Sequence, residues 1–208
     1  EHALQFVSEA YESSPRLVSP LMFPNTVLNS ISGWVSIVLG SRELNTTINL
    51  GNSSGINALK TAYEYVELGI VKYALVVTEE ITKSVVESDL SSSSEYTEET
   101  IGILIGNNEE GYEIESSYSR YTERRNFEDS FSKLVEENPT YQIYGFLENH
   151  ESKNKCNVVM SKEANRLSCN SLNMLYDLLE QNIQKFIIVE ESKSSIYSYL
   201  KLKRSGHE

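Results

Sequence analysis

The sequence predicts an α/β fold, and two stretches carry most of that prediction. The first, residues 46–62, is a β-favouring run of alternating polarity that stops at Gly51 and resumes as a helix. The second, Tyr73–Thr78, is a continuous apolar run, typical of a strand covered on both faces. A strand, a helix and a second strand with a crossover of this length predict a parallel βαβ unit.

The residues before this unit predict two helices. The first spans Ala3–Glu12, and the second spans Val27–Leu39 and is closed by Gly40, after a stretch in which Pro20 and Pro24 forbid helix. The second helix is apolar on most of its circumference. A helix of this kind is buried between layers or in a subunit interface.

The residues after the unit continue the alternation of helices and strands. Thr100–Ile105 and Tyr112–Tyr118 predict two strands of a hairpin, joined across residues 107–111, and Ser88–Thr97 predicts a loop. The remaining predicted elements are a helix at Phe127–Glu137, strands at Tyr141–Leu147 and Asn157–Ser161, a helix at Leu172–Gln181, and a final strand pair at Lys185–Glu190 and Ile196–Lys203. No linker or repeat interrupts them, so we expect one domain over residues 1–208.

The composition excludes several classes of function. The net charge is −12, and the segment from Glu79 to Ser117 contains eleven acidic residues and a single basic one, Lys83. This charge argues against a nucleic-acid partner. No apolar run approaches the roughly 18 residues of a membrane span, and no secretory leader is expected. Cys156 and Cys169 lack metal-ligand spacing. We therefore expect a soluble, cytoplasmic protein without a metal or cofactor.

The turn between the first strand and its helix is the main candidate site. Such an elbow holds residue 52 at the helix N-terminus, where free N–H groups and the helix dipole favour an anion or an activated nucleophile. Residue 52 is an asparagine, which is not a nucleophile. We expect Asn52 to cap and order the elbow through its side-chain amide.

Four motifs of the first sixty residues resemble the N-terminal half of β-ketoacyl synthases of the thiolase-like superfamily. They are the stretches 19–29, 33–40, 45–48 and 54–59. Weaker similarities follow in register, with Glu99 in a segment similar to Ser-Glu-Gly-Ala-Ala and Lys162 in the place of the family's Thr-Lys lysine. The resemblance implies a layered α/β/α fold, truncated at the N-terminus, in which residues 1–106 form the later part of the N-terminal half and residues 107–208 an abbreviated C-terminal half.

The departures from the family bear on its catalytic residues. The acyl-accepting cysteine of active synthases aligns with Asn52, and of the two histidines only the first has a counterpart, His150. The residues after Lys162 contain no second histidine, and residues 190–194 replace the glycine-rich gate loop. An asparagine amide cannot form a thioester, so the resemblance implies no condensation by this chain alone.

The pattern of losses favours a catalytically silent subunit similar to chain-length-factor partners. Such a subunit pairs with an active ketosynthase in type II polyketide, polyene or fatty-acid-like synthesis, where it shapes the acyl tunnel or stabilises the dimer. It meets the acyl carrier protein indirectly. The family's two-fold interface is implied at Val27, Ile31, Trp34 and Val35 of the apolar helix and at Thr46, Thr47, Ile48, Asn49 and Leu50 of the strand.

Two alternatives remain open. In the first, the chain is a malonyl-carrier-protein decarboxylase in which the Asn52 amide donates a hydrogen bond to a developing enolate, with His150 as a residual site member. In the second, it is a divergent thiolase-like domain with a structural or interaction role.

Overall fold

A computed structural model of the chain describes residues 2–16, 18, 19, 21, 24, 26–51, 53–81, 98–107, 110–121, 124–146, 170–191 and 196–206. Described residues up to 49 belong to one compact unit, and those from Leu50 onwards belong to a second. None of the described helices is long and apolar enough to cross a membrane. The predicted loop at 88–97 and the predicted strand at 157–161 lie outside these residues.

The first unit contains two helices, as the sequence predicts. Helix α1 spans His2–Glu12, and helix α2 spans Ser30–Leu39 and ends at Gly40, whose φ of 66° suits a glycine. Helix α2 begins three residues later than the apolar pattern indicates. None of its residues is buried, so the described part of the chain leaves its apolar circumference largely uncovered.

The predicted strand at residues 46–50 is not formed. Among the described residues, only Leu50 makes a bridge, and residues 46–49 belong to no ladder. A β-favouring sequence becomes a strand only where a neighbour accepts its hydrogen bonds. Here side chains hold the segment instead: Asn45 Nδ2 donates to Ser32 O (2.9 Å), and the Thr47 and Ser32 hydroxyls lie 2.8 Å apart. The predicted parallel βαβ unit is therefore wrong in this structure.

The second unit contains two sheets. A four-stranded sheet has the order β3-β6-β5-β4, in which only β4 and β5 are parallel. Its strands are β3 (Tyr112–Tyr121), β6 (Ile196–Arg204), β5 (Lys185–Glu191) and β4 (Gln142–Phe146). A two-stranded antiparallel sheet pairs β1 (Tyr73–Ile81) with β2 (Glu98–Gly106).

The predicted hairpin between Thr100–Ile105 and Tyr112–Tyr118 is wrong. Both strands exist, but β2 pairs with β1 and β3 pairs with β6, so the connection passes from one sheet to the other. Turn residues indicate where a strand ends. Which strands pair depends on how whole layers pack, and a local sequence pattern holds no information about that packing.

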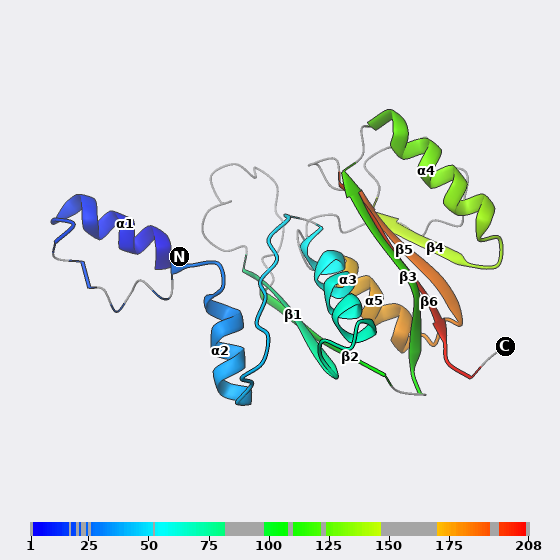
Figure 1. Ribbon diagram of the computed structural model, residues 1–208. Helices are drawn as coiled ribbons and strands as arrows, with labels where there is room; N and C mark the ends of the chain where they lie inside the picture. Colours follow the sequence, from blue (N-terminus) through cyan, green and yellow to red (C-terminus); the bar gives the residue numbers. More distant parts are fainter. Residues whose placement is uncertain are drawn as a thin grey trace. The chain divides into compact units, whose positions relative to one another are not determined.

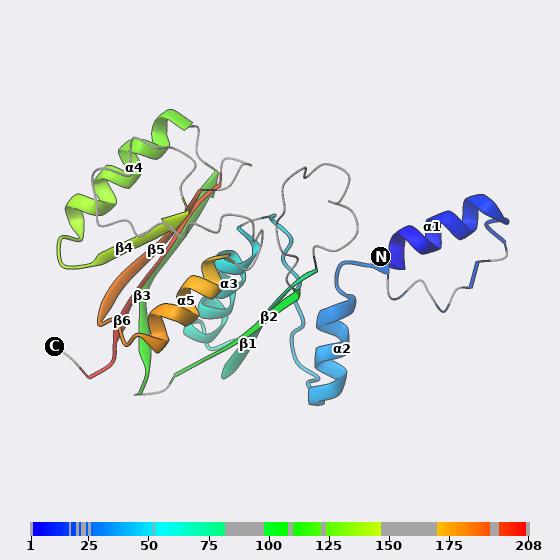
Figure 2. The ribbon, with the colours of Figure 1, turned by 180° about the vertical axis from the view of Figure 1, so that it is seen from behind.

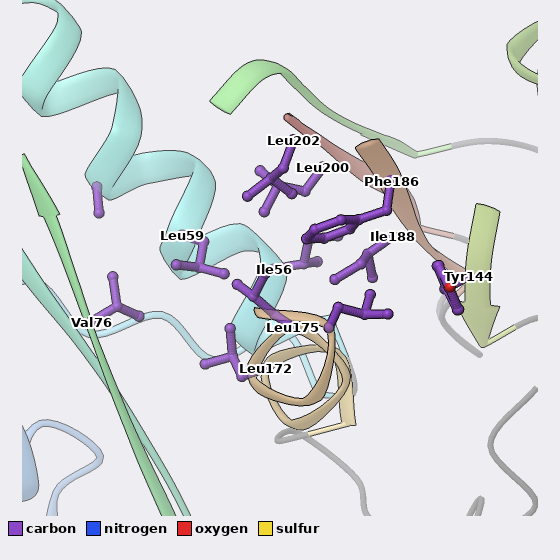
Figure 3. Close-up of a cluster of buried hydrophobic side chains, with 12 residues drawn as sticks. Ile56, Leu59, Val76, Tyr144, Leu172, Leu175, Phe186, Ile188, Leu200 and Leu202 are labelled. Atoms are coloured by element: carbon purple, nitrogen blue, oxygen red, sulfur yellow. The ribbon is translucent and has the colours of Figure 1, made fainter. Parts of the chain in front are cut away.

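Helices lie on both faces of the four-stranded sheet. Helix α3 (Ser54–Glu67) and helix α5 (Asn170–Glu180) lie side by side between the two sheets, and helix α4 (Arg124–Glu137) covers the opposite face (Figures 1 and 2). The alternating side chains of β5 serve both faces. Phe186 and Ile188 pack against α3 and α5, as Figure 3 shows, whereas Ile187 and Val189 pack against α4.

Strand β1 is covered on one face, not on both. Val76 is buried in the cluster that contains Ile56 and Leu59 of α3, whereas Leu75 is 46% exposed. Leu104, which lies opposite Leu75 on β2, is exposed as well. The continuous apolar run is therefore buried on the side of α3 only.

Candidate functional site

The two residues that the sequence marks for chemistry, Asn52 and His150, lie outside the described residues, as does Lys162. The chain on either side of Asn52 is described. Gly51 has a φ of 60°, which favours glycine, and Ser54 Oγ accepts from the N–H of Leu50 (2.9 Å) and donates to the carbonyl of Gly51 (2.7 Å). The turn of the elbow is therefore present before α3, although no described strand precedes it, and the hydroxyl of Ser54 orders it.

Two buried polar residues lie at the start of helix α3: Ser53 directly before it and Asn57 in its first turn. Asn57 Nδ2 donates to the carbonyl of Ser53 (2.8 Å) and to Ser198 Oγ on β6 (3.3 Å). Ser53 is fully buried, and its Oγ has no hydrogen-bond partner among the described residues. The start of α3 thus brings a satisfied amide and an unsatisfied hydroxyl against the four-stranded sheet.

The sheet presents a row of polar residues to this helix start. Ser119 on β3 and Glu190 on β5 both lie opposite Ser198, and the hydroxyls of Ser119 and Ser198 are 2.9 Å apart. Residues directly opposite in antiparallel strands point to the same face of a sheet. Because Asn57 binds Ser198, that face is the one covered by α3 and α5. We call Ser53, Asn57, Ser119, Ser171, Glu190 and Ser198 the polar row.

Glu190 is the unusual member of the polar row. Its side chain is 1% exposed, and Oε2 has no hydrogen-bond partner within the described part of the chain. Burial raises the pKa of Glu190 to about 8, and the nearby Ser171 lowers it by a smaller amount. Ser171 Oγ nevertheless makes no bond of hydrogen-bond geometry to any described residue. Glu190 is therefore a neutral acid at pH 7.

The polar row has the chemistry of a hydrogen-bond donor site. A protonated carboxyl and two free hydroxyls each offer a donor, and no Lys, Arg or second acid of the described residues belongs to the row. Three of its members lie at the ends of elements: Ser53 directly precedes α3, Ser171 is the second residue of α5, and Glu190 is the last but one of β5.

No group of three or more metal-ligating residues occurs in the part of the chain that the structure describes. The sequence did not reveal Glu190 as a site residue. The sequence predicts Glu190 as the last residue of a strand and as the first residue of the segment that replaces the family's gate loop. Its burial follows from the apolar run of β5 that precedes it. A charged residue directly after four buried apolar residues was the available signal.

A second carboxylate lies on the other side of the sheet and is paired. Glu115, at a β-bulge of β3, accepts a short hydrogen bond from Tyr141 Oη and forms ion pairs with Lys201 (3.4 Å) and Lys203 (3.3 Å). Lys201 also lies over the ring of Tyr141, 4.4 Å from its centre. Burial alone would raise the pKa of Glu115, but these partners together lower it.

The predicted interface residues are placed at the surface. Ile31 and Trp34 of α2 are 44% and 58% exposed, Val27 just before the helix is also exposed, and Val35 is half-buried. Among residues 46–50, only Ile48 is half-buried and the others are exposed.

Comparison with known proteins identifies the fold. No protein-family model and no curated protein sequence matches the chain. Among solved structures, the ishigamide ketosynthase/chain length factor matches with a TM-score of 0.80 and 14% identity, over 99% of this chain and 70% of that one. The chain has the ketosynthase fold. A type II PKS acyl-carrier protein in complex with its ketosynthase bound to the hexaketide matches with a TM-score of 0.75 and 14% identity, over 98% of this chain and 70% of that one.

The fold also extends to more distant ketosynthases. A β-ketoacyl-[acyl carrier protein] synthase III from Thermus thermophilus matches with a TM-score of 0.60 and 12% identity, over 85% of this chain and 73% of that one. These matches confirm the predicted thiolase-like α/β fold.

Proposed function

We propose that this chain is a catalytically silent ketosynthase-like subunit that pairs with an active ketosynthase in type II polyketide or fatty-acid-like synthesis. In that complex it stabilises the dimer and shapes the space that holds the acyl chain. The acyl carrier protein delivers its cargo to the complex, and the active subunit performs the condensation.

The elbow before α3 supports the silent role. The sequence resemblance aligns the family's acyl-accepting cysteine with Asn52, and the chain's two cysteines, Cys156 and Cys169, stand far from this position in the sequence. A covalent acyl-enzyme needs a thiol or hydroxyl nucleophile. Of the two described hydroxyls of the elbow, that of Ser54 already bonds the backbone at Leu50 and Gly51. That of Ser53 is fully buried and has no described hydrogen-bond partner that could act as its base.

The observation that carries the partner role is helix α2. Ten residues long and apolar on most sides, it has no buried residue, and Ile37, Val38 and Leu39 are all more than half exposed. Exposed apolar patches of this kind mark interaction sites. Two of the matched structures contain a ketosynthase with a chain length factor or an acyl-carrier protein. An active ketosynthase subunit is therefore the partner that we assign to this helix.

Co-expression with a ketosynthase that retains its cysteine tests the pairing. We expect a heterodimer on gel filtration, and we expect Ile31→Asp to weaken it at least tenfold, because the substitution places a charge in an apolar contact. Leu68→Asp is the matched control, since Leu68 is an exposed leucine outside α2. A well-behaved monomer in the presence of the ketosynthase, or equal effects of both substitutions, would contradict the proposal.

The silent role is tested separately with malonyl-carrier protein. We expect the isolated chain to give neither a condensed nor a decarboxylated product by mass spectrometry. Acetyl-carrier protein formed by the wild type and lost in Asn52→Ala would instead establish the decarboxylase.

A further inference from the structure

Three buried polar atoms of the polar row lack partners within the described residues: Ser53 Oγ, Ser171 Oγ and Glu190 Oε2. Each belongs to a side chain that is at most 2% exposed. A buried polar atom without a hydrogen bond costs roughly 1–3 kcal/mol, so native proteins rarely keep several together unless a ligand or water completes them. The lack of partners at these three atoms indicates a ligand by itself, without any argument from the two helix N-termini beside them.

The three groups belong to one neighbourhood. Asn57 links Ser53 to Ser198 through its amide, Glu190 lies opposite Ser198 in the ladder, and Ser171 lies close enough to Glu190 to affect its pKa. The N-terminal ends of α3 and α5 therefore meet the sheet at the same place, and each end contributes one free hydroxyl.

The charge of the row decides the class of ligand. The polar groups placed around Glu190 are Ser171 of α5, which affects its pKa, Ser198 of β6, which lies opposite it in the ladder, and Asn57 of α3, which binds Ser198. Tyr144 of β4 belongs to the buried cluster on the same face; burial raises its pKa, so its hydroxyl stays protonated, and it donates to Gln142 (2.5 Å). No described cation faces the site to bind an anion, and the neutral Glu190 offers little to a cation. The complementary group is a neutral acceptor, such as a carbonyl oxygen.

We propose that Glu190, Ser53 and Ser171 form a hydrogen-bond donor site that binds a keto oxygen of the acyl chain handled by the ketosynthase complex. This inference rests on the proposed function, which supplies the acyl chain. Because residue 52 cannot hold the chain as a thioester, the carbonyl that reaches this subunit is one along the chain, not an attached one.

A pair of amides that differ only in the keto group tests the site. N-butylacetoacetamide carries the keto oxygen and does not transfer its acyl group, and N-butylbutyramide lacks that oxygen. Both are titrated by NMR into the heterodimer at pH 6.5. We expect the ketoamide to bind roughly five- to tenfold more tightly than the butyramide, which corresponds to one good hydrogen bond.

Substitutions at Glu190 test whether its carboxyl group donates a hydrogen bond to the ligand or is only buried. Glu190→Leu should abolish the preference, whereas Glu190→Gln, which keeps an N–H donor, should retain it. In the wild type the preference should decline as the pH rises past about 8, the pKa of Glu190, and in Glu190→Gln it should not. Glu180→Gln is the matched control, since Glu180 is an exposed glutamate at the end of α5, and it should behave as the wild type.

Two outcomes would overturn the inference. One is equal affinity of the wild-type complex for the two amides, and the other is a preference that Glu190→Gln shows with the same pH dependence as the wild type. Neither result bears on the proposed function if gel filtration shows an intact heterodimer. Failure to form the heterodimer contradicts the proposed function and leaves the amide titration to be made on the chain alone, where the same expectations hold.

Discussion

The two faces of the four-stranded sheet treat a carboxylate in opposite ways. On the face of α3 and α5, Glu190 is almost fully buried without a charged partner, and its pKa is raised to about 8. On the face of α4, Glu115 is ringed by Tyr141, Lys201 and Lys203, and its pKa is lowered. The same residue type is therefore neutral on one face and charged on the other.

The difference indicates a structural role for Glu115 and a place in the candidate site for Glu190. A paired, partly exposed carboxylate ties strands together and satisfies its own hydrogen-bonding capacity. An unpaired, buried acid costs stability, and unpaired buried groups gather at functional sites. The face that holds Glu190 also holds the elbow that precedes α3. Among the described residues, that face carries most of the buried polar atoms without a hydrogen-bond partner, whereas the face of α4 carries one, Tyr197 Oη.

The largest expected effect is on the pH dependence of folding. Glu190 keeps its proton in the folded protein up to about pH 8 and loses it near pH 4.5 when unfolded. The folded state therefore binds more protons in this window, and stability falls as the pH rises through it, by on the order of 4 kcal/mol. We expect Glu190→Gln to remove this decline and to exceed the wild type in stability at pH 9.

Urea unfolding at half-unit steps from pH 5 to pH 9 measures both profiles. Glu180→Gln, which changes an exposed glutamate of α5, serves as the control and should follow the wild type. Parallel profiles of the wild type and Glu190→Gln would show that Glu190 is ionised in the folded protein, and the contrast between the two faces would disappear.

The second effect concerns the amide that joins α3 to the sheet. Asn57→Ala removes a buried donor to Ser53 and Ser198, and we expect a loss of about 2 kcal/mol in the free energy of unfolding. Asn138→Ala is the matched control. Asn138 makes the same kind of bond, to the carbonyl four residues earlier, but at the partly exposed end of α4 (2.8 Å).

Thermal unfolding of both variants decides the point. We expect the Asn138 substitution to cost about half as much, since water replaces its lost bond. Equal costs would mean that burial in the polar row adds nothing to the Asn57 amide.

Local patterns in the sequence predicted most elements of the second unit. The helical pattern that follows Gly51 predicted α3, and Lys185–Glu190 was predicted as the strand that the structure shows as β5, because the side chains that form the core also set the period. The pairing of strands was not predictable in this way. Thr46–Leu50 has the composition of a strand but has no ladder, and β2 and β3 lie in different sheets despite a turn signal between them.

The candidate site was likewise predictable only where local sequence determines the structure. The sequence predicted an elbow between a strand and α3, and the structure confirms its turn at Gly51 and Ser54 but not the strand before it. It gave no indication that Glu190 and Ser171 would meet there. They are brought together by β5 and α5, whose packing is fixed by the whole layer of helices and not by the residues next to them.

The smallest expected effect is on the paired face. Glu115→Gln removes the charge that attracts Lys201 and Lys203, and we expect a loss of about 1 kcal/mol at pH 7, since exposed pairs are screened by water. Because the pKa of Glu115 is lowered in the folded protein, its contribution is present above the unfolded value of about 4.5 and is lost as the pH falls below it.

The direction of this pH dependence is opposite to that of Glu190, so acid and alkaline unfolding report on different faces of one sheet. Urea unfolding at pH 7 and pH 3.5 measures the difference, and 1 M NaCl should reduce it. Glu137→Gln is the control, since its pair with Lys133 is more exposed and should contribute within about 0.5 kcal/mol. If Glu115→Gln costs as much at pH 3.5 as at pH 7, its role is packing, and charge no longer distinguishes the face of α4 from that of Glu190.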